Sequence, residues 1–315
     1  MHGKYAILCN DKGGILNDPV LLRLSEDEFW FSISDSDLLF WLQGVNVTKK
    51  FDVIIDEIDV CPVQIQGPLS EDLMAKLAGE ELREVPYYGL MEAKVGGADC
   101  VISQTGFTGE KGYEIYVRDA HANAEKMWNA VLEAGEEFGL MVIAPAHHRR
   151  IAAGILSWGQ DLDHETSPFQ VNLAYQVPRN KKADYIGKEE LEKQREVIDA
   201  GEFPFKMRMV GITLGGKEIT DYAPDFWLVS DSEGSDVGYV TSPWWSPELE
   251  TNIALAWVPW NLSEVGTKLQ VKLPDEYSES SGVAVEAQVV DVPFRESVNP
   301  NKREVQKEKG LDYAD

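Results

Sequence analysis

The segment at residues 105–117 (TGFTGEKGYEIYV) joins a glycine-rich turn directly to an alternating strand. Its three glycines fall within seven residues, and glycine alone reaches positive φ without steric cost, so a tight turn is predicted. In the strand that follows, Tyr113 and Ile115 share one face, whereas Glu114 and Tyr116 share the other. Ile115 marks the core side. Glu114 is therefore expected to face away from the core, just past the turn.

A carboxylate at this position has two possible uses. Held on a rigid strand, Glu114 can accept two parallel hydrogen bonds from a flat ligand that carries adjacent N–H groups. The alternative is an ordinary hairpin whose glutamate is simply solvated. The spacing alone does not decide between the two.

A second polar feature lies near the start of the chain. The NDKGG turn at residues 10–14 predicts a hairpin whose return strand covers residues 15–22. Asn17 and Asp18 place polar groups inside that strand, and Pro19 removes a backbone donor, which indicates an edge or a bulge. Buried polar groups need partners or a ligand. For Asp18, bonds to nearby backbone N–H groups and contact with a ligand both remain open.

The charge balance restricts the partners of this chain. Its 315 residues carry 29 Lys and Arg against 54 Asp and Glu, a net charge of −25 at pH 7. Such a surface repels nucleic acid and anionic membranes, so neither is an expected partner. Cys9, Cys61 and Cys100 are far apart and form no CxxC pair, so buried thiols in a reducing compartment are predicted. Without a signal peptide or an apolar run of about 18 residues, the expected location is the cytoplasm.

A change of composition near residue 201 divides the chain. Residues 1–200 predict an α+β region, with further strands at 51–58 and 171–177. Residues 201–315 predict a small antiparallel barrel or sandwich of six short strands, followed by a tail that frays from Asn299. His147 and His148 do not predict a metal site, because adjacent helical side chains diverge by about 100° and no further ligand lies at the right spacing.

With these segments in order, the chain resembles the folate-dependent aminomethyltransferase family, that of the glycine-cleavage T-protein. The matching blocks are residues 10–18, 65–68, 105–115, 185–189, 240–242 with 246–247, and 292–294. They extend over essentially the whole chain. The resemblance implies a cloverleaf of α+β domains that ends in a C-terminal antiparallel β-barrel. It also implies that roughly 80 N-terminal residues of the family's first domain are absent.

Details within the family favour the branch of dimethylsulfoniopropionate demethylase. Asn17, Asp18 and Pro19 match that branch, as does the Ser-aromatic-Gly run at residues 157–159. Residues 145–147 read Pro-Ala-His where the T-protein has Ala-Arg-Asp, so one expected arginine contact to folate is missing. The central turn at residues 108–110, in contrast, is similar to the T-protein.

The resemblance also implies roles for individual residues. Glu114 matches the glutamate that holds the pterin ring of tetrahydrofolate, and Asp18 matches the aspartate next to the folate nitrogens and the reacting carbon. Tyr113 and Tyr116 flank the implied pterin site and can stack or hydrogen-bond there, although packing is the better explanation of each. Arg150 is the one family arginine retained in its block and is expected to contact the cofactor.

The implied activity is transfer of a methyl or aminomethyl-derived group from a small donor to tetrahydrofolate. A sulfonium or similar methylated donor is favoured, and a lipoyl carrier protein is the expected partner if the chain acts like the T-protein. A folate-binding protein without transferase activity is the alternative from another class. Trp244 and Trp245, in a predicted loop between two Ser-Pro pairs, can form an aromatic wall for a cationic donor or simply pack in the barrel.

Overall fold

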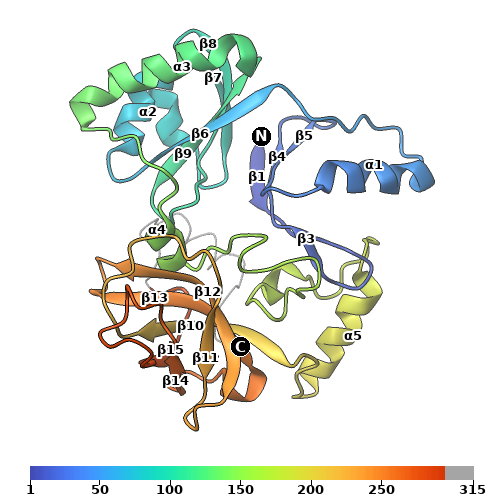
Figure 1. Cartoon of the computed structure of the whole chain (residues 1–315). Coiled ribbons are helices and arrows are strands. Elements are labelled where there is room, and N and C mark those ends of the chain that lie inside the picture. The colour runs from blue at the N-terminus through green and yellow to red at the C-terminus, as the bar shows by residue number, and fades with distance from the viewer. Residues whose placement is uncertain (295–315) are drawn as a thin grey trace. The chain divides into compact units, whose positions relative to one another are not determined.

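The computed structural model describes residues 1–294, and Figure 1 shows its two compact units. Residues 1–6 and 19–145 belong to the first unit, and residues 7–18 and 146–294 belong to the second. The expected fraying from Asn299 lies outside the described residues. No helix among residues 1–294 is both long enough and apolar enough to cross a membrane.

A four-stranded antiparallel sheet with two helices on one face organises the first unit (Figure 1). Its strands follow the order β6-β9-β8-β7, which is β6 (Val60–Gln66), β9 (Gly112–Arg118), β8 (Ala98–Ser103) and β7 (Leu90–Val95). The helices α2 (Ser70–Ala78) and α3 (Ala120–Gly135) contribute Met74 and Met127 to a core that also contains Ile115. The apolar side of β9 is therefore buried under both helices, as predicted.

The opposite face of this sheet packs on a second, three-stranded sheet. This sheet has the order β1-β4-β5, from β1 (His2–Tyr5), β4 (Val20–Arg23) and β5 (Phe29–Ser32). Leu22 and Trp30 from this sheet form a core cluster with Val101 and Tyr116. Strand β9 is thus covered on both faces, which fixes the direction of each of its side chains.

Two predictions for the first unit need correction. Residues 51–58 form no strand; they run as irregular chain after helix α1 (Leu38–Lys49). Cys61 is exposed, unlike the buried Cys9 and Cys100. It belongs to β6 and shares the face of Val63 and Ile65, but its side chain, near the start of the strand, stays in solvent.

The predicted return strand at residues 15–22 is two strands. A short hairpin of β2 (Leu8–Cys9) and β3 (Ile15–Asn17) belongs to the second unit, whereas β4 pairs with β1 and β5 in the first. The break falls at Asp18 and Pro19. Proline cannot donate a ladder hydrogen bond, which explains why the ladder stops there.

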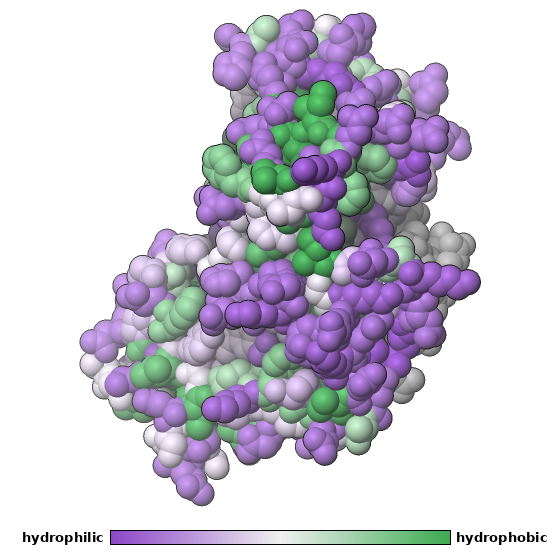
Figure 2. All heavy atoms as spheres, turned by 90° about the vertical axis from the view of Figure 1, so that its right-hand side faces the viewer, coloured by the Kyte–Doolittle hydropathy of each residue, from purple (hydrophilic) through white to green (hydrophobic). Residues whose placement is uncertain are grey.

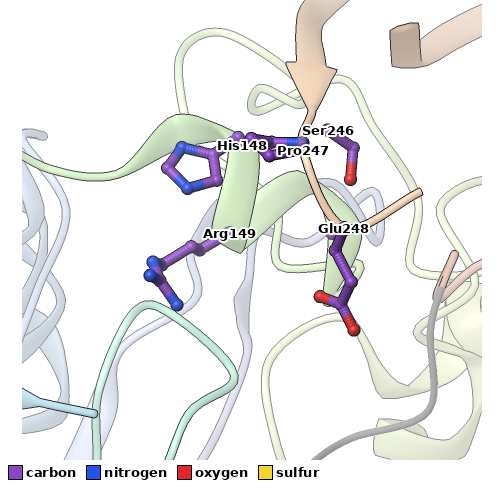
Figure 3. A pocket seen from close by; sticks show the side chains of 6 residues that line it. His148, Arg149, Ser246, Pro247 and Glu248 are labelled. Atoms are coloured by element: carbon purple, nitrogen blue, oxygen red, sulfur yellow. The ribbon is translucent and has the colours of Figure 1, made fainter. Parts of the chain in front are cut away.

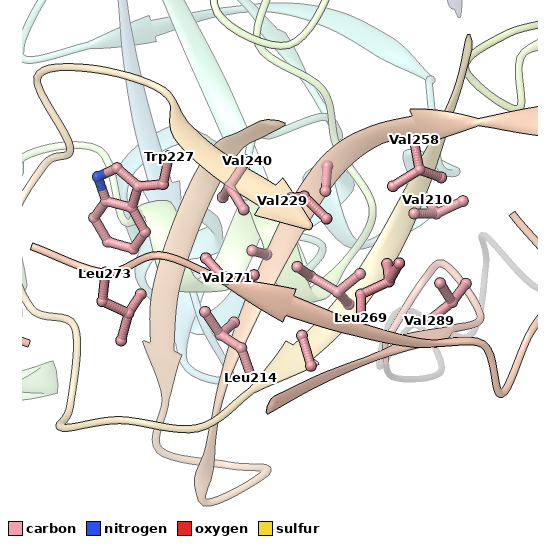
Figure 4. Packing of buried hydrophobic residues seen from close by; sticks show 14 of the residues in the cluster. Val210, Leu214, Trp227, Val229, Val240, Val258, Leu269, Val271, Leu273 and Val289 are labelled. Carbon is pink, nitrogen blue, oxygen red and sulfur yellow. The ribbon is translucent and has the colours of Figure 1, made fainter. Parts of the chain in front are cut away.

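A closed antiparallel barrel of six strands dominates the second unit, as predicted. Its order is β10-β13-β12-β11-β14-β15, from β10 (Met207–Leu214), β13 (Thr251–Pro259), β12 (Asp236–Ser246), β11 (Trp227–Ser230), β14 (Lys268–Val271) and β15 (Val285–Val290). Figure 4 shows side chains such as Val229, Val240 and Leu269 filling its interior. Closure removes the sheet edges that a small antiparallel sheet would otherwise expose.

The rest of the second unit is short helices and loops. It contains α4 (His147–Ala152) and α5 (Lys188–Asp199). Residues 171–177 are not a strand as predicted but turns and a 3-10 helix, η3 (Ala174–Gln176). The second unit also contains the 3-10 helix η4 (Trp260–Leu262), and η1 (Glu80–Glu84) and η2 (Glu136–Phe138) belong to the first unit. Trp244 and Trp245 lie inside β12 rather than in a loop, paired with Ile253 and Asn252 of β13.

Candidate functional site

Glu114 occupies the middle of β9, where three hydroxyl groups surround it. Its neighbours across the ladder are Gln64 of β6 and Ser103 of β8. The Tyr116 hydroxyl donates a hydrogen bond to Glu114 Oε2 over 3.0 Å, and the Thr105 hydroxyl donates to the same oxygen. The Ser103 hydroxyl is hydrogen-bonded to that of Thr105. A chain of side-chain hydrogen bonds therefore fixes one carboxylate oxygen.

The other oxygen of Glu114 is left for a different partner. Within residues 1–294, both side-chain hydrogen bonds of Glu114 go to Oε2, and the side chain is half-buried rather than enclosed. Burial, and after it the charge of Glu114, raises the pKa of Tyr116, which keeps the phenol neutral and able to donate. Glu114 thus presents Oε1 as an oriented acceptor.

The glycine-rich turn before β9 is shaped by Gln66. A Cβ at Gly106 would lie 2.2 Å from Gln66 Oε1, and one at Gly112 would lie 2.5 Å from Gln66 Cδ. Gln66 Nε2 donates to the Thr105 carbonyl over 3.1 Å, and its Oε1 accepts from the Thr108 hydroxyl over 2.9 Å. Of the three glycines in the turn, Gly109 alone has a positive φ, of 72°. A side chain at either of the other two positions would have to displace the Gln66 amide, whose hydrogen bonds tie the turn to β6.

The structure separates Tyr113 from Tyr116. Tyr113 is fully buried in the core beneath α2 and α3, on the opposite face of β9 from Glu114. Its hydroxyl lies 3.3 Å from Gln104 Nε2 and 3.3 Å from Glu71 Oε2, and burial raises its pKa to about 12. Tyr116 lies on the face of Glu114. Only the second tyrosine therefore acts on that carboxylate.

Asp18 stands at the end of the β2–β3 hairpin, which is tied to the second unit from several directions. The Asn10 side chain closes the turn by accepting from Gly14 N over 2.9 Å and donates to the His164 carbonyl over 2.8 Å. Trp158 Nε1 donates to the Ile15 carbonyl over 3.0 Å. Asp18 itself is half-buried and its Oδ1 is inaccessible to solvent. These ties hold the backbone that carries Asp18.

Arg150 is not on the surface but inside a polar network. The side chains of Arg150 and Asp161 are 1% and 0% exposed, and Arg150 Nη1 donates to Asp161 Oδ2 over 2.8 Å. Arg150 Nη2 donates to the Ser242 hydroxyl over 2.7 Å. Asp161 Oδ1 accepts from the hydroxyls of Thr241, over 2.6 Å, and Ser242, over 2.5 Å. Arg150 therefore joins α4 to the barrel.

The same arginine orients an aromatic group. Arg150 Nε donates to His147 Nδ1 over 3.2 Å, which leaves the imidazole proton on Nε2 when the ring is neutral. The His147 ring stacks on Trp244 with centroids 5.3 Å apart and meets Tyr222 edge-on at 5.5 Å. Burial and the Arg150 charge lower the pKa of His147. Trp245 points elsewhere on the strand, and its backbone N–H donates to the Ile219 carbonyl over 2.8 Å.

A small pocket lies beside this group, between α4 and the end of β12. Figure 3 shows Arg149 and Glu248 on either side of α4, with His148, Ser246 and Pro247 above them. Ala152 completes its lining. The volume of about 220 Å³ is below the roughly 300 Å³ at which pockets for drug-sized ligands begin. A ligand of the size of a folate does not fit this pocket.

Sequence reasoning missed several of these groups. The sequence pattern does not single out Ser103 or Thr105, although a hydroxyl that precedes a glycine turn is a signal for local side-chain bonding. His147 and Tyr222 had no signal, because they come from distant segments and meet only after folding.

Comparison with known proteins defines the class of this fold and site. Residues 2–181 match the GCVT N-terminal domain, and residues 208–295 match the glycine cleavage T-protein C-terminal barrel domain. The chain therefore belongs to the glycine cleavage T-protein family of folate-dependent aminomethyltransferases.

Individual relatives support the same family, and one solved structure shares the fold. Dimethylsulfoniopropionate demethylase of Ruegeria pomeroyi is 33% identical over 271 residues, which cover 86% of this chain and 71% of the relative. The aminomethyltransferase of Thermotoga maritima is 32% identical over 300 residues, or 92% and 75% of the two chains. The crystal structure of aminomethyltransferase T from Bartonella henselae matches 94% of this chain and 76% of its own with a TM-score of 0.73; at 24% identity it shows the fold alone.

Proposed function

We propose that this chain transfers a one-carbon group from a small methylated donor to tetrahydrofolate, as a demethylase of the dimethylsulfoniopropionate type. The observation that carries the proposal is the geometry of Glu114. One oxygen is fixed by Thr105 and Tyr116, and the other is presented for a donor outside the described residues. A carboxylate so oriented suits the adjacent N–H groups of a pterin ring.

The hydrogen bonds that Glu114 already accepts change the way it is expected to bind the pterin ring. Oε2 already accepts two hydrogen bonds, so its lone pairs are used. Oε1 then carries the principal contact to the pterin, and the second parallel bond contributes less. Tyr116 and Thr105 keep Oε1 aimed, and Tyr113, in the core, takes no part.

Tetrahydrofolate when bound supplies the acceptor nitrogen for the one-carbon group. Asp18 is proposed to orient that nitrogen and to stabilise positive charge that develops on it during transfer. The hairpin contacts described above hold Asp18 on a fixed backbone. Such a reaction depends on proximity and alignment, so it requires no nucleophilic side chain.

A cationic donor is favoured by the aromatic group of the second unit. Trp244, His147 and Tyr222 lie together, and aromatic faces attract sulfonium and ammonium groups. Trp245 is turned to the other side of β12, so it is no longer proposed to contact the cationic donor. The family resemblance of residues 17–19 to the demethylase branch adds to this argument. Arg150 is proposed to position His147 rather than to touch folate.

Two other functions are distinguished by experiment. In one, the chain accepts an aminomethyl group from a lipoyl carrier protein, and the relatives named aminomethyltransferase support that reading. In the other, it binds folate without catalysis. Turnover should be measured with tetrahydrofolate and either dimethylsulfoniopropionate or an aminomethyl-loaded lipoyl carrier protein, with the folate product separated by chromatography.

The proposal expects product with the sulfonium donor and none with the carrier protein. Product formed only with the aminomethyl-loaded carrier protein would show that this carrier, and not the sulfonium compound, is the donor. If calorimetry shows folate binding but neither donor is turned over, the chain is a folate-binding protein without transferase activity.

An Asp18→Asn variant tests the catalytic part of the proposal. The substitution keeps the shape and removes the charge, so the rate constant should fall at least about tenfold while folate affinity changes by only a few-fold. Asp11→Asn, an exposed aspartate in the same hairpin, is the matched control. Turnover at the parent rate in Asp18→Asn would make Asp18 a structural residue.

A further inference from the structure

A half-buried glutamine, Gln160, is hydrogen-bonded to the aromatic group formed by His147, Tyr222 and Trp244. The Tyr222 hydroxyl donates to Gln160 Oε1 over 3.0 Å, and the Tyr222 ring meets His147 edge-on. All four residues belong to the second unit. Gln160 is therefore placed to set the direction of the Tyr222 side chain.

The hydrogen bonds of Gln160 fix the orientation of its amide. Its Nε2 donates to the Thr241 carbonyl over 2.8 Å, so Oε1 is left as an acceptor on the other side of the amide. Arg150 Nη2 lies 3.4 Å from the same Oε1, and Arg150 Nε donates to His147 Nδ1 over 3.2 Å. One buried arginine thus orients His147 directly and Tyr222 through Gln160.

The backbone that carries Tyr222 is anchored independently of Gln160. Ile219 is fully buried in the barrel core, and its N–H donates to the Asn252 side chain over 3.1 Å. Asn252 Nδ2 also donates to the Lys217 carbonyl over 3.0 Å. Tyr222 follows shortly after Ile219 and is 55% exposed. Loss of the Gln160 amide should therefore release the Tyr222 side chain without unfolding the segment.

The hydrogen bond to Gln160 also determines what Tyr222 offers to a ligand. A hydroxyl has one proton to donate, and that proton is directed to Gln160. The lone pairs of the Tyr222 oxygen are left for the polarised methyl groups of a sulfonium or quaternary ammonium ion, which the aromatic face of Trp244 also attracts. A Tyr222 side chain turned into solvent would remove this oxygen from the group.

We infer that Gln160 is a positioning residue for a methylated onium donor, because it holds Tyr222 against His147 with the hydroxyl oxygen available to the methyl groups. The inference rests on the proposed function, in which this aromatic group binds the donor. Neither Gln160 nor Tyr222 takes part in the transfer step itself. Substitution of either residue should therefore raise the KM of the donor and leave kcat and folate affinity close to the parent values.

A cation is attracted to this protein as a whole, and a local site must be distinguished from that attraction. The chain has a net charge of −25, and Figure 2 shows one face that is covered largely by hydrophilic side chains. Substitutions that keep the net charge leave this general attraction unchanged. Gln160→Met removes both amide hydrogen bonds at a similar side-chain length, and Tyr222→Phe removes only the hydroxyl.

Choline is the probe, and the reference ligand is its neutral isostere, in which a tert-butyl group replaces the trimethylammonium group. Dissociation constants of both should be measured by ligand-observed NMR titration without folate. The parent should bind choline about tenfold more tightly than the isostere. Gln160→Met and Tyr222→Phe should each weaken choline binding by about three- to tenfold and change isostere binding by less than about twofold. Equal binding of the two ligands to the parent would overturn the inference.

A double-variant cycle shows whether the two residues act as one unit. If Gln160 acts by holding Tyr222, the variant that combines Gln160→Met with Tyr222→Phe should bind choline no more weakly than the weaker of the two single variants. Losses that multiply in the double variant would show that Gln160 acts separately from Tyr222, which contradicts the inference.

The matched control is Gln170→Met. Gln170 is also half-buried, and its amide donates to the Met207 carbonyl over 3.0 Å and accepts from Ser167 N over 3.0 Å. This variant loses the same kind of hydrogen bonds without touching Tyr222, so it should bind choline like the parent. A loss as large as that of Gln160→Met would mean that loosening of the second unit, and not the position of Tyr222, weakens binding.

Turnover separates this inference from the proposed function. With dimethylsulfoniopropionate as the donor, a raised KM and a nearly unchanged kcat in Gln160→Met support both. Methyl transfer with the parent KM in Gln160→Met would overturn the inference alone, whereas choline binding that depends on Gln160 without any methyl transfer would overturn the proposed function alone. If Gln160→Met does not fold, Tyr222→Phe decides, because it removes one atom from an exposed side chain. Parent affinity for choline in Tyr222→Phe would then reject the inference.

Discussion

Two carboxylates, Glu114 on β9 and Asp161 beside α4, are each held by hydroxyl groups, yet they differ in what remains open. Asp161 is fully buried, and both of its oxygens accept hydrogen bonds from the protein, including one from Arg150. Glu114 is half-buried, and its hydrogen bonds within the described residues all fall on one oxygen. No cation of the described residues is paired with it.

The two carboxylates show how a charge that supports the fold differs from one that can bind a ligand. A buried charge that is fully satisfied stabilises the fold only as long as all its partners remain, because an orphaned buried charge is costly. An oriented carboxylate with an open oxygen costs little in the folded state and is ready for a ligand. Substitutions at Arg150 and Glu114 distinguish the two kinds of carboxylate.

The largest effect is expected from Arg150→Ala. Removing the arginine leaves Asp161 buried without its counter-ion, so the free energy of unfolding should fall by about 3–5 kcal/mol in chemical denaturation. Arg179→Ala, at the exposed pair with Asp199, should cause a far smaller loss. The double variant Arg150→Met with Asp161→Leu should recover part of the stability. If Arg150→Ala and Arg179→Ala cost the same, the buried network is not a stabilising unit.

Glu114→Gln should weaken folate binding without unfolding the protein. Loss of the charge on Oε1 should cost about 2–3 kcal/mol of binding free energy, measured by calorimetry with tetrahydrofolate. The free energy of unfolding should change by less than about 1 kcal/mol, because the glutamine still accepts from Thr105 and Tyr116. Glu133→Gln, at an exposed glutamate of α3, is the control. An unchanged folate affinity in Glu114→Gln would remove the residue from the site.

The two tryptophans of β12 should differ. Trp244→Leu removes the ring that stacks on His147 and should raise the KM of a cationic donor by about tenfold, which corresponds to roughly 1–2 kcal/mol. Trp245→Leu lies on the other side of the strand and should leave that KM nearly unchanged. Steady-state kinetics with both variants make the test. Similar rises in KM would show that neither ring is specific for the donor.

The smallest effect concerns pH. The folded-state pKa of His147 lies below its reference value of 6.5, owing to burial and then the charges of Arg150 and His148, with Asp161 acting in the opposite direction. Below pH 6.5 the unfolded chain therefore binds more protons than the folded one, and stability falls as the pH decreases through this range. In denaturation between pH 5 and 8, His147→Gln should flatten the dependence. If the dependence of stability on pH is unchanged in His147→Gln, other titratable groups cause it.

Much of the fold followed from local pattern. Alternation in residues 113–117 predicted that Ile115 faces the core and Glu114 the opposite side, and the clusters on the two faces of β9 confirm it. The six short strands after residue 206 predicted the barrel. The strand predicted at 51–58 was wrong, because apolar residues without a neighbouring strand have no ladder to join. The strand at 171–177 was wrong because turns and a 3-10 helix satisfied its backbone locally.

The sequence by itself determined the side of β9 on which Glu114 lies, the glycine turn before it and the family to which the chain belongs. The oxygen of Glu114 that is already bonded became visible only in the folded structure, where the Thr105 and Tyr116 hydroxyls both donate to Oε2. Tertiary structure also placed Arg150 in the interior, bonded to Asp161 and Ser242. The alternation of side chains along a strand is a local property of the backbone, so the sequence reveals it. Hydrogen-bond partners come from segments that meet only when the chain has folded.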